Sequence, residues 1–272
     1  SRRHQASLVA ATPGSLTSSQ AGCTQVTHPL PIGNVGQSDL TSALGSGVET
    51  HWQDAFDGYA TASQLHGQGG WKGWYNDPAG GALASATFSR SAPNSAEIVG
   101  ASDLVHEWAG VTGGAWVLTA WQYLPAGFTG ESYLILLNQY DDAGSNLNWS
   151  TQVSFDSAVA LVSNDGAAGG TLPLLTGQWV EIRVEIDLVA DLQRFYYGGA
   201  LLFEGSWSGG VSGGGSTALA AIDLFANGST AVYYDDFSLT AACQSPADVP
   251  WLSVSPSSGT TAPAGTRPPR PP

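Results

Sequence analysis

The stretch "QWVEIRVEIDL" (residues 178–188) alternates between apolar and charged side chains. Successive side chains of a β-strand point to opposite faces of the sheet. One face of this segment would carry only the apolar side chains, those of Val180, Ile182, Val184, Ile186 and Leu188. The other face would carry the charged side chains, those of Glu181, Arg183, Glu185 and Asp187. The pattern predicts a strand that covers a core on one side and meets water on the other.

A second strand pair is predicted directly after this segment. In "RFYYGGALLFEG" (194–205), Gly198 and Gly199 can adopt the positive φ angles that a two-residue hairpin turn requires. Similar strand-like runs occur at 96–100, 116–124, 132–140, 148–155, 158–163, 218–226 and 232–239. About nine to eleven such strands predict an all-β fold, a two-sheet antiparallel jelly-roll sandwich with extended N- and C-terminal arms.

The composition limits the possible functions. Of 272 residues, 42% are hydrophobic, which is enough to form a sizeable core. The net charge is −14, and half of the eight Lys and Arg residues lie near the ends of the chain, at Arg2, Arg3, Arg267 and Arg270. An acidic body argues against nucleic-acid binding and is compatible with divalent cations and with neutral glycans as partners.

Several features favour a secreted or cell-surface protein. The chain has no Met and no apolar run long enough to span a membrane, so we expect a processed, mature product. Asn148 and Asn227 each begin a glycosylation tripeptide. Because Cys23 and Cys243 are the only cysteines, secretion predicts a disulfide between them.

The sequence predicts three regions. Residues 1–50 form a Ser-, Thr- and Gly-rich arm, residues 51–243 form the jelly roll, and residues 244–272 form a tail with a proline-rich end. The tail contains one lone candidate strand, "WLSVS" (251–255). This strand could fold back on the sandwich, remain free, or pair with the sheet edge of a neighbouring chain. The last possibility would make the protein a homopolymer, a filament formed by strand exchange between terminal arms.

Four segments carry a resemblance to a known family. "FDGYATASQLHGQGGWKGW" (56–74), "RSAPNSAEIVG" (90–100), "WVEIRVEIDLVADLQRFYYGGALL" (179–202) and "VYYDDFSL" (232–239) resemble the laminin-G-like, concanavalin A-like jelly rolls of bacterial secreted proteins. The resemblance implies two curved antiparallel sheets. Members of the family range from lectin-like modules to glycosidases and lyases, so the fold alone does not assign a function. Residues 250–266 resemble the opening of an Ig-like repeat.

The adjacent acids Asp235 and Asp236 pose a separate question, because alternation directs one of them toward the core. A buried carboxylate needs a partner. The resemblance implies a structural Ca²⁺ ion held by this pair together with Asp54 and Asp57 of the first strand segment, and oxygen-rich clusters of this kind suit calcium. The alternative is that one aspartate caps a loop and the other is solvated.

Two further sets of residues bear on activity. Glu181, Glu185 and Asp187 could mimic a glycosidase carboxylate series, but the intervening Arg183 would keep both glutamates ionised, which is unsuitable for a general acid. Aromatic residues in or near loops could stack on sugars or could pack in the core; they are Trp71, Trp74, Tyr75, Trp121 and Tyr123.

We therefore expect a secreted, non-catalytic module that binds glycans or neighbouring extracellular protein subunits. Two alternatives remain open at this point. One is a structural subunit that polymerises through its terminal arms, and the other is a polysaccharide-degrading glycosidase or lyase on the same fold.

Overall fold

The computed structural model describes residues 9–11, 32–34, 40–43, 50–242 and 258–261. The chain divides into two compact units. Residues 49–242 form one unit, and residues 1–48 together with 243–272 form the other.

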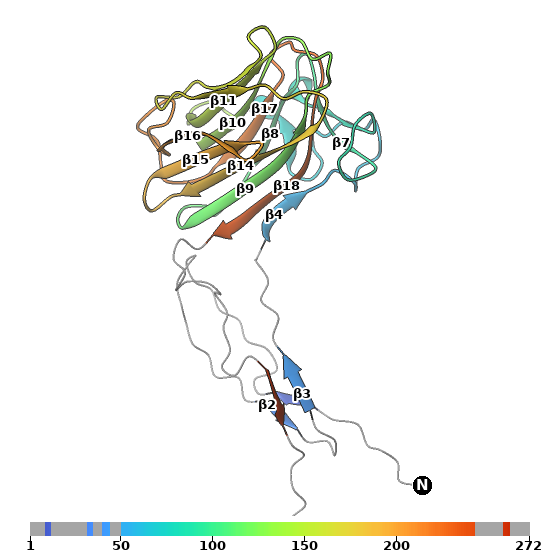
Figure 1. Ribbon diagram of the computed structural model, residues 1–272, viewed down its shortest axis with the longest axis vertical. Coiled ribbons are helices and arrows are strands. Elements are labelled where there is room, and N and C mark those ends of the chain that lie inside the picture. Colours follow the sequence, from blue (N-terminus) through green and yellow to red (C-terminus); the bar gives the residue numbers. More distant parts are fainter. Residues whose placement is uncertain (1–8, 12–31, 35–39, 44–49, 243–257, 262–272) are drawn as a thin grey trace, which may run out of the picture. The chain divides into compact units, whose positions relative to one another are not determined.

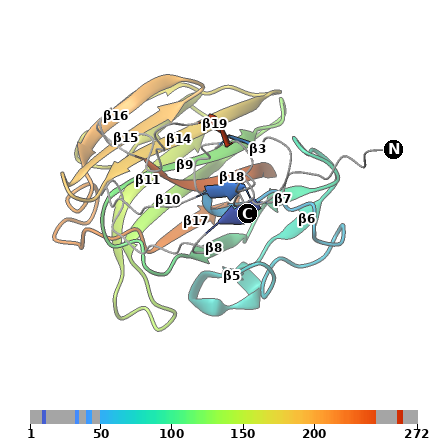
Figure 2. The same ribbon diagram turned by 90° about the horizontal axis from the view of Figure 1, so that it is seen from below.

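The unit of residues 49–242 is a sandwich of two antiparallel sheets (Figures 1 and 2). The seven-stranded sheet has the order β13-β12-β11-β10-β17-β8-β5. Its strands are β5 (Trp71–Gly73), β8 (Asp103–Glu107), β10 (Glu131–Gln139), β11 (Asn148–Asp156), β12 (Leu161–Asn164), β13 (Thr171–Pro173) and β17 (Ala221–Phe225).

The eight-stranded sheet has the order β16-β15-β14-β9-β18-β7-β6, and β4 also pairs with β18. Its strands are β4 (Thr50–Asp54), β6 (Leu83–Ser85), β7 (Ser95–Ile98), β9 (Ala115–Tyr123), β14 (Trp179–Asp187), β15 (Leu192–Tyr197), β16 (Ala200–Ser206) and β18 (Val232–Ala242). The only helical elements among the described residues are the 3₁₀ turns η1 (Trp74–Asn76) and η2 (Pro78–Gly80). Neither of these turns has the length and apolar character needed to cross a membrane.

The predicted all-β jelly-roll sandwich is confirmed, and the core lies between the two sheets. In β14, Val180, Ile182, Val184 and Ile186 are all buried, whereas the charged residues between them are only partly covered. Each fully buried side chain of this kind contributes roughly 1.5–3 kcal/mol to stability. The predicted hairpin is also present, since β15 and β16 are joined at Gly198 and Gly199, whose φ angles are +57° and +81°.

An aromatic cluster closes one part of the core around the carboxylate of Asp54. The rings belong to Trp52, Phe56, Trp71, His106, Trp108 and Phe237. Asp54 Oδ1 accepts a hydrogen bond from the Phe56 backbone N–H at 2.8 Å, and Oδ2 accepts one from the Trp71 indole N–H at 2.9 Å. The Tyr59 hydroxyl also donates to Oδ2. Asp54 thus joins β4, the following turn and β5 by hydrogen bonds.

The other unit contains two small antiparallel pairs. β1 (Val9–Ala11) pairs with β2 (Ile32–Asn34), and β3 (Leu40–Ala43) pairs with β19 (Ser258–Thr261). A strand from the C-terminal region therefore pairs with one from the N-terminal region of the same chain. The predicted strand at 251–255 lies outside the described residues, as do Cys23 and Cys243. Strand exchange between chains and the disulfide both stay predictions.

We expect His106 to make the stability of the sandwich sensitive to acid. Burial lowers the pKa of His106 from 6.5 to about 4, although the charge of Asp54 and a hydrogen bond to the Gly69 backbone act in the opposite direction. The unfolded state therefore binds a proton first as the pH falls. The stability that the neutral ring contributes is present above pH 6.5 and is lost progressively down to about pH 4, by about 3 kcal/mol.

Urea unfolding of the parent protein and of His106→Gln at pH 7 and pH 4.5 checks this expectation. The parent should lose more unfolding free energy over this interval than the variant does. Equal losses in the two proteins would show that His106 is not the group responsible.

Candidate functional site

The outer face of the seven-stranded sheet carries an unusual mixture of apolar and acidic side chains. In β17, Ile222 and Leu224 point into the core, so that alternation places Asp223 on the outer face. The same face holds a second apolar cluster, separate from the main core. Its buried members are Val105, Ile135, Leu137, Tyr140 and Ala221.

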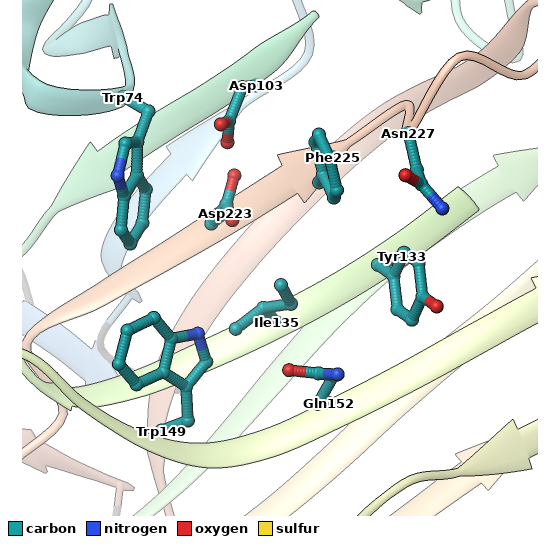
Figure 3. A pocket seen from close by; sticks show the side chains of 9 residues that line it. All are labelled: Trp74, Asp103, Tyr133, Ile135, Trp149, Gln152, Asp223, Phe225 and Asn227. Carbon is teal, nitrogen blue, oxygen red and sulfur yellow. The ribbon is translucent and has the colours of Figure 1, made fainter. Parts of the chain in front are cut away.

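A pocket of about 320 Å³ opens on this face (Figure 3). It is lined by residues from four neighbouring strands and the loops next to them. They are Trp74, Asp103, Tyr133, Ile135, Trp149, Gln152, Asp223, Phe225 and Asn227. Aromatic rings and a few convergent polar groups are the usual lining of a ligand site in a protein.

Two half-buried tryptophans form one end of the pocket. The ring centroids of Trp74 and Trp149 are 6.1 Å apart and their planes are inclined by 30°. Tyr140 supports Trp74 from the side, with a centroid separation of 5.1 Å and an angle of 70°. The Tyr140 hydroxyl also accepts a hydrogen bond from the Tyr75 backbone N–H at 3.0 Å. The loop that carries Trp74 is therefore fixed to the sheet surface.

Two hydrogen bonds with Ser212 hold the backbone of Trp149. Its N–H donates to the Ser212 hydroxyl at 3.2 Å, and the Ser212 N–H donates to the Trp149 carbonyl at 3.1 Å. Trp149 also lies at an irregularity in the pairing of β10 with β11, where the register shifts beside Leu137. Bulges of this kind commonly redirect a side chain near a functional site.

The pocket contains two carboxyl groups that face each other, those of Asp103 and Asp223 (Figure 3). Asp223 is only 3% exposed. The Oδ1 atoms of Asp103 and Asp223 receive no hydrogen bond from another donor in the described part of the chain. The two groups can hydrogen-bond each other only when one of them holds a proton. Burial raises the pKa of both groups, and the charge of Asp103 raises that of Asp223 further.

In the described part of the chain, no cationic side chain on this face is paired with the two carboxyl groups. Lys72 lies in β5 at the edge of the sheet and forms ion pairs with Glu107 and Asp142. The negative charges of Glu131, Asp165 and Asp156 contribute to raising the pKa of Tyr133, although burial is the largest cause. The surroundings of the pocket are therefore acidic.

The structure separates the five aromatic residues that sequence suggested for glycan binding. Trp71 is 1% exposed and packs in the core, so its ring offers no face to a ligand. Trp74 lines the pocket, and Tyr75, which is 49% exposed, follows it in the chain. Trp121 and Tyr123 lie in β9 of the other sheet. Two different surfaces thus carry the four available rings.

On the eight-stranded sheet, the chain's own side chains cover these rings. The Arg90 guanidinium lies 3.8 Å from the centroid of the Trp121 ring, and Phe88 stacks on Tyr123 at 4.3 Å. Of the carboxylates of β14, Glu185 forms ion pairs with Arg183 and Arg194. This face resembles a solvated, ion-paired surface more than a binding pocket.

Most of the carboxylates expected to bind calcium already have hydrogen-bond donors within the chain. The four residues are Asp54, Asp57, Asp235 and Asp236. Asp235 is fully buried and accepts hydrogen bonds from the backbone N–H groups of Arg90 (2.7 Å), Ser91 (3.1 Å) and Asp236 (2.7 Å). Asp236 bonds the Arg90 guanidinium and the Ser91 hydroxyl.

These donors, and those already described for Asp54, satisfy the carboxylates within the chain, while Asp57 is exposed. These hydrogen bonds offset part of the burial cost that suggested a cation, while burial still raises the pKa of Asp235 to about 6. Among the described residues, no group of three or more His, Cys, Asp or Glu side chains is arranged to hold a metal ion. Calcium stays a prediction that rests on the family resemblance.

The two glycosylation tripeptides differ in accessibility. Asn148 is 9% exposed, donates to the Gly213 carbonyl at 2.9 Å and accepts a hydrogen bond from Asn138 at 2.9 Å. Asn227 is exposed and lines the pocket. A glycan on Asn148 would have to break these hydrogen bonds, whereas one on Asn227 would stand at the pocket. Neither modification is tested by the structure.

Sequence reasoning did not identify Asp103, Asp223 or Trp149 as members of a site. The available signal was a single aspartate inside an otherwise apolar strand, as in "AIDLF" (221–225). An acid at such a position is unexpected in a strand that has one face in a core, and this is a reason to examine what surrounds it.

The comparisons with known proteins found no match to a protein-family profile and no match among curated protein sequences. Among solved structures, the fold is similar to that of an endo-β-1,4-glucuronan lyase from the fungus Trichoderma reesei, with a TM-score of 0.48 and 10% identity over 71% of this chain and 96% of the other. A carbohydrate-binding module from Bacillus subtilis gives a TM-score of 0.41 and 12% identity over 63% and 96% of the two chains.

Domain 4 of an extracellular arabinanase from Geobacillus stearothermophilus, solved with arabinotriose, gives a TM-score of 0.41 and 15% identity over 74% and 97% of the two chains. Similarities at this level carry no argument about activity or ligand. The description of this chain as a jelly-roll sandwich rests on its own sheet order and core, and the site rests on its own side chains.

We expect Asp223→Asn to reduce the pH dependence of stability. Because the pKa of Asp223 is raised in the folded state, the folded protein holds a proton that the unfolded chain releases above its ordinary pKa near 4. The parent should therefore lose stability as the pH rises from about 4 toward 8, and the variant should lose less. Urea unfolding at both pH values measures this, with Asp156→Asn on the same sheet as a control. A variant whose stability falls as steeply as that of the parent would contradict the assignment.

The calcium prediction has its own test. If an ion is held by Asp54, Asp57, Asp235 and Asp236, excess chelator lowers the melting temperature and added Ca²⁺ restores it, because the ion stabilises only the folded state. A melting curve that is unchanged in chelator and in millimolar Ca²⁺ would exclude a bound ion.

Proposed function

We propose that residues 49–242 form a secreted, non-catalytic module that binds glycan chains in the pocket on the outer face of the seven-stranded sheet. The observation that carries this proposal is the pair Trp74 and Trp149, two half-buried rings held by other residues at the mouth of a pocket with polar groups along its sides.

Rings in this arrangement suit the apolar faces of sugars. A sugar ring presents C–H groups on its faces and hydroxyls around its rim, and aromatic side chains combine apolar area with a small loss of conformational freedom on binding. Because other residues already fix Trp74 and Trp149, little ordering remains to be done when a ligand binds.

The polar lining suits the rim of a sugar. Gln152 and Asn227 each offer donors and acceptors, and the Asp103–Asp223 pair offers acceptor oxygens. A hydrogen bond from the Gln152 Nε2 to Asp165 at 3.0 Å orients this side chain. The bond uses the nitrogen of the amide, so the amide oxygen can accept a hydrogen bond from a ligand. A pocket with apolar walls and few polar groups is typical of selective small-ligand sites.

Three observations favour binding over catalysis. The carboxylate series of β14 lies on the other sheet, and its Glu185 is ion-paired with two arginines. In the pocket, Asp103 and Asp223 lie within hydrogen-bonding reach of each other, closer than the roughly 5–5.5 Å separation used by retaining glycosidases. Among the described residues that line the pocket, none is a Lys or Arg that could stabilise a developing negative charge.

The wider assignment is also part of the proposal. A laminin-G-like module of an extracellular or surface assembly agrees with the acidic body and with the pocket, and its partners in the assembly would be glycans or neighbouring protein subunits. Assembly into a filament through the terminal regions is the alternative. Size measurement of the protein without ligand separates the two, since a module is monomeric at concentrations at which a filament grows.

Binding measurements with tryptophan variants test the site. We expect Trp74→Ala and Trp149→Ala each to weaken binding of a glycan selected from an array by about tenfold or more, since a buried aromatic anchor commonly contributes 2 kcal/mol or more. Trp121→Ala is the matched control, because it removes a half-buried tryptophan from the other sheet. Isothermal titration calorimetry gives the dissociation constants.

A loss of binding with Trp121→Ala alone would move the site to the other face and overturn the proposal. Release of shortened sugar products from the selected glycan would instead identify an enzyme. Melting curves of all three variants show whether a loss of affinity has a folding cause.

A further inference from the structure

The floor of the pocket contains a pair of acceptors that the chain does not satisfy. Asp103 comes from β8 and Asp223 from β17, which are hydrogen-bonded neighbours in the sheet. Their Oδ1 atoms are buried and receive no donor among the described residues, and Figure 3 shows the two carboxyl groups facing each other between Trp74 and Phe225. Buried polar atoms are nearly always satisfied. Among the described buried polar side-chain atoms that lack a partner, these two belong to residues that line the pocket, where a ligand could supply the donor.

The missing donor is not supplied by any basic side chain that the structure describes. Within residues 51–242 the Lys and Arg residues are Lys72, Arg90, Arg183 and Arg194. Arg183 and Arg194 lie in β14 and β15 of the other sheet, and Arg90 is bound to Asp236 and Trp121. Lys72 is on the correct sheet but is paired with Glu107 and Asp142.

The chemistry of the pair defines what would satisfy it. A hydroxyl group donates one hydrogen bond, so a single sugar hydroxyl cannot serve two acceptors on different strands. A protonated amine has three donors and no acceptor, and its hydrogen bonds to carboxylates are charge-assisted and therefore strong. It would also relieve the repulsion that raises the pKa of Asp223.

We propose that the pocket selects glycans that contain a protonated amino sugar, whose ammonium group binds between Asp103 and Asp223 while the sugar ring stacks on Trp74 or Trp149. This inference rests on the proposed glycan-binding function and adds the ligand class. The tryptophan rings favour the same ligand for two reasons: they stack on its sugar ring, and the face of an indole also attracts a cation.

The same arrangement disfavours an acidic sugar. A uronate carboxylate in this pocket would meet Asp103 and Asp223, and none of the described lining residues is basic. Bringing like charges together in a site that is partly shielded from water costs several kcal/mol of binding free energy. An N-acetylated sugar would still stack but would lose the charge and two of the donors.

Three probes of equal length test the inference: a fully deacetylated chitosan oligosaccharide, its N-acetylated counterpart and an oligouronate. Calorimetry is done at pH 6 in 0.3 M NaCl, where salt screens the general attraction of a cation to an acidic protein. We expect the deacetylated oligomer to bind the parent protein at least about tenfold more tightly than the N-acetylated oligomer, since each charge-assisted hydrogen bond is worth about that much. The oligouronate should bind weakest.

Variants then show which residues cause the preference for the deacetylated oligomer. Asp103→Asn and Asp223→Asn should abolish it while leaving the affinity for the N-acetylated oligomer nearly unchanged. Asp156→Asn removes the same charge from the same sheet at a residue that does not line the pocket, where Oδ1 accepts a hydrogen bond from the Ala158 N–H, so it should keep the preference. Melting curves confirm that each variant is folded.

Equal affinity of the parent for both chitosan oligomers, or a preference that persists in both Asp→Asn variants of the pocket, overturns the inference. If the N-acetylated oligomer binds in a manner that depends on Trp74 and Trp149 but no preference exists, glycan binding stands and the amino-sugar inference fails alone. If no glycan from the array or from this set binds, both fail.

Discussion

The structure of the site depends on one constraint, the strict alternation of side chains across the seven-stranded sheet. Leu104, Ile222 and Leu224 must lie in the core between the sheets, because leaving them in water would forfeit several kcal/mol. Their neighbours in β8 and β17 are thereby directed to the outer face. Pairing of Leu104 with Leu224 fixes the register and makes Asp103 and Asp223 near neighbours. Burial of these apolar side chains thus outweighs the cost of bringing two carboxyl groups close together in a partly desolvated position.

The buried and partly buried carboxylates discussed above divide into two kinds, and the difference identifies the candidate site. Asp54 and Asp235 each accept three hydrogen bonds from N–H or O–H donors, so they stabilise loops and strand ends. The Oδ1 atoms of Asp103 and Asp223 receive no hydrogen bond from a described donor, and both residues line the pocket. A satisfied buried acid is a structural element, whereas an unsatisfied one beside fixed aromatic rings has unused capacity for a ligand.

The two outer faces of the sandwich also differ in how charge is balanced. On the eight-stranded sheet, arginines pair with some of the acids and lie over the rings of Trp121 and Tyr196, so that these rings are covered by the chain's own side chains. On the seven-stranded sheet, the only described lysine is already paired. This asymmetry supports a ligand site on the second face, and it argues for a ligand that brings positive charge.

The sequence by itself determined the features that depend on local periodicity. Alternation in residues 178–188 and the Gly198-Gly199 turn predicted β14 and the β15–β16 hairpin, and the repeated short runs predicted the all-β sandwich. The site required the tertiary structure. Trp71 and Trp74 are close in sequence, yet one is in the core and the other at the pocket. Asp103 and Asp223 are far apart in sequence and meet only because β8 pairs with β17. Strand order is a non-local choice made by packing, and no local pattern in a single sequence reports it.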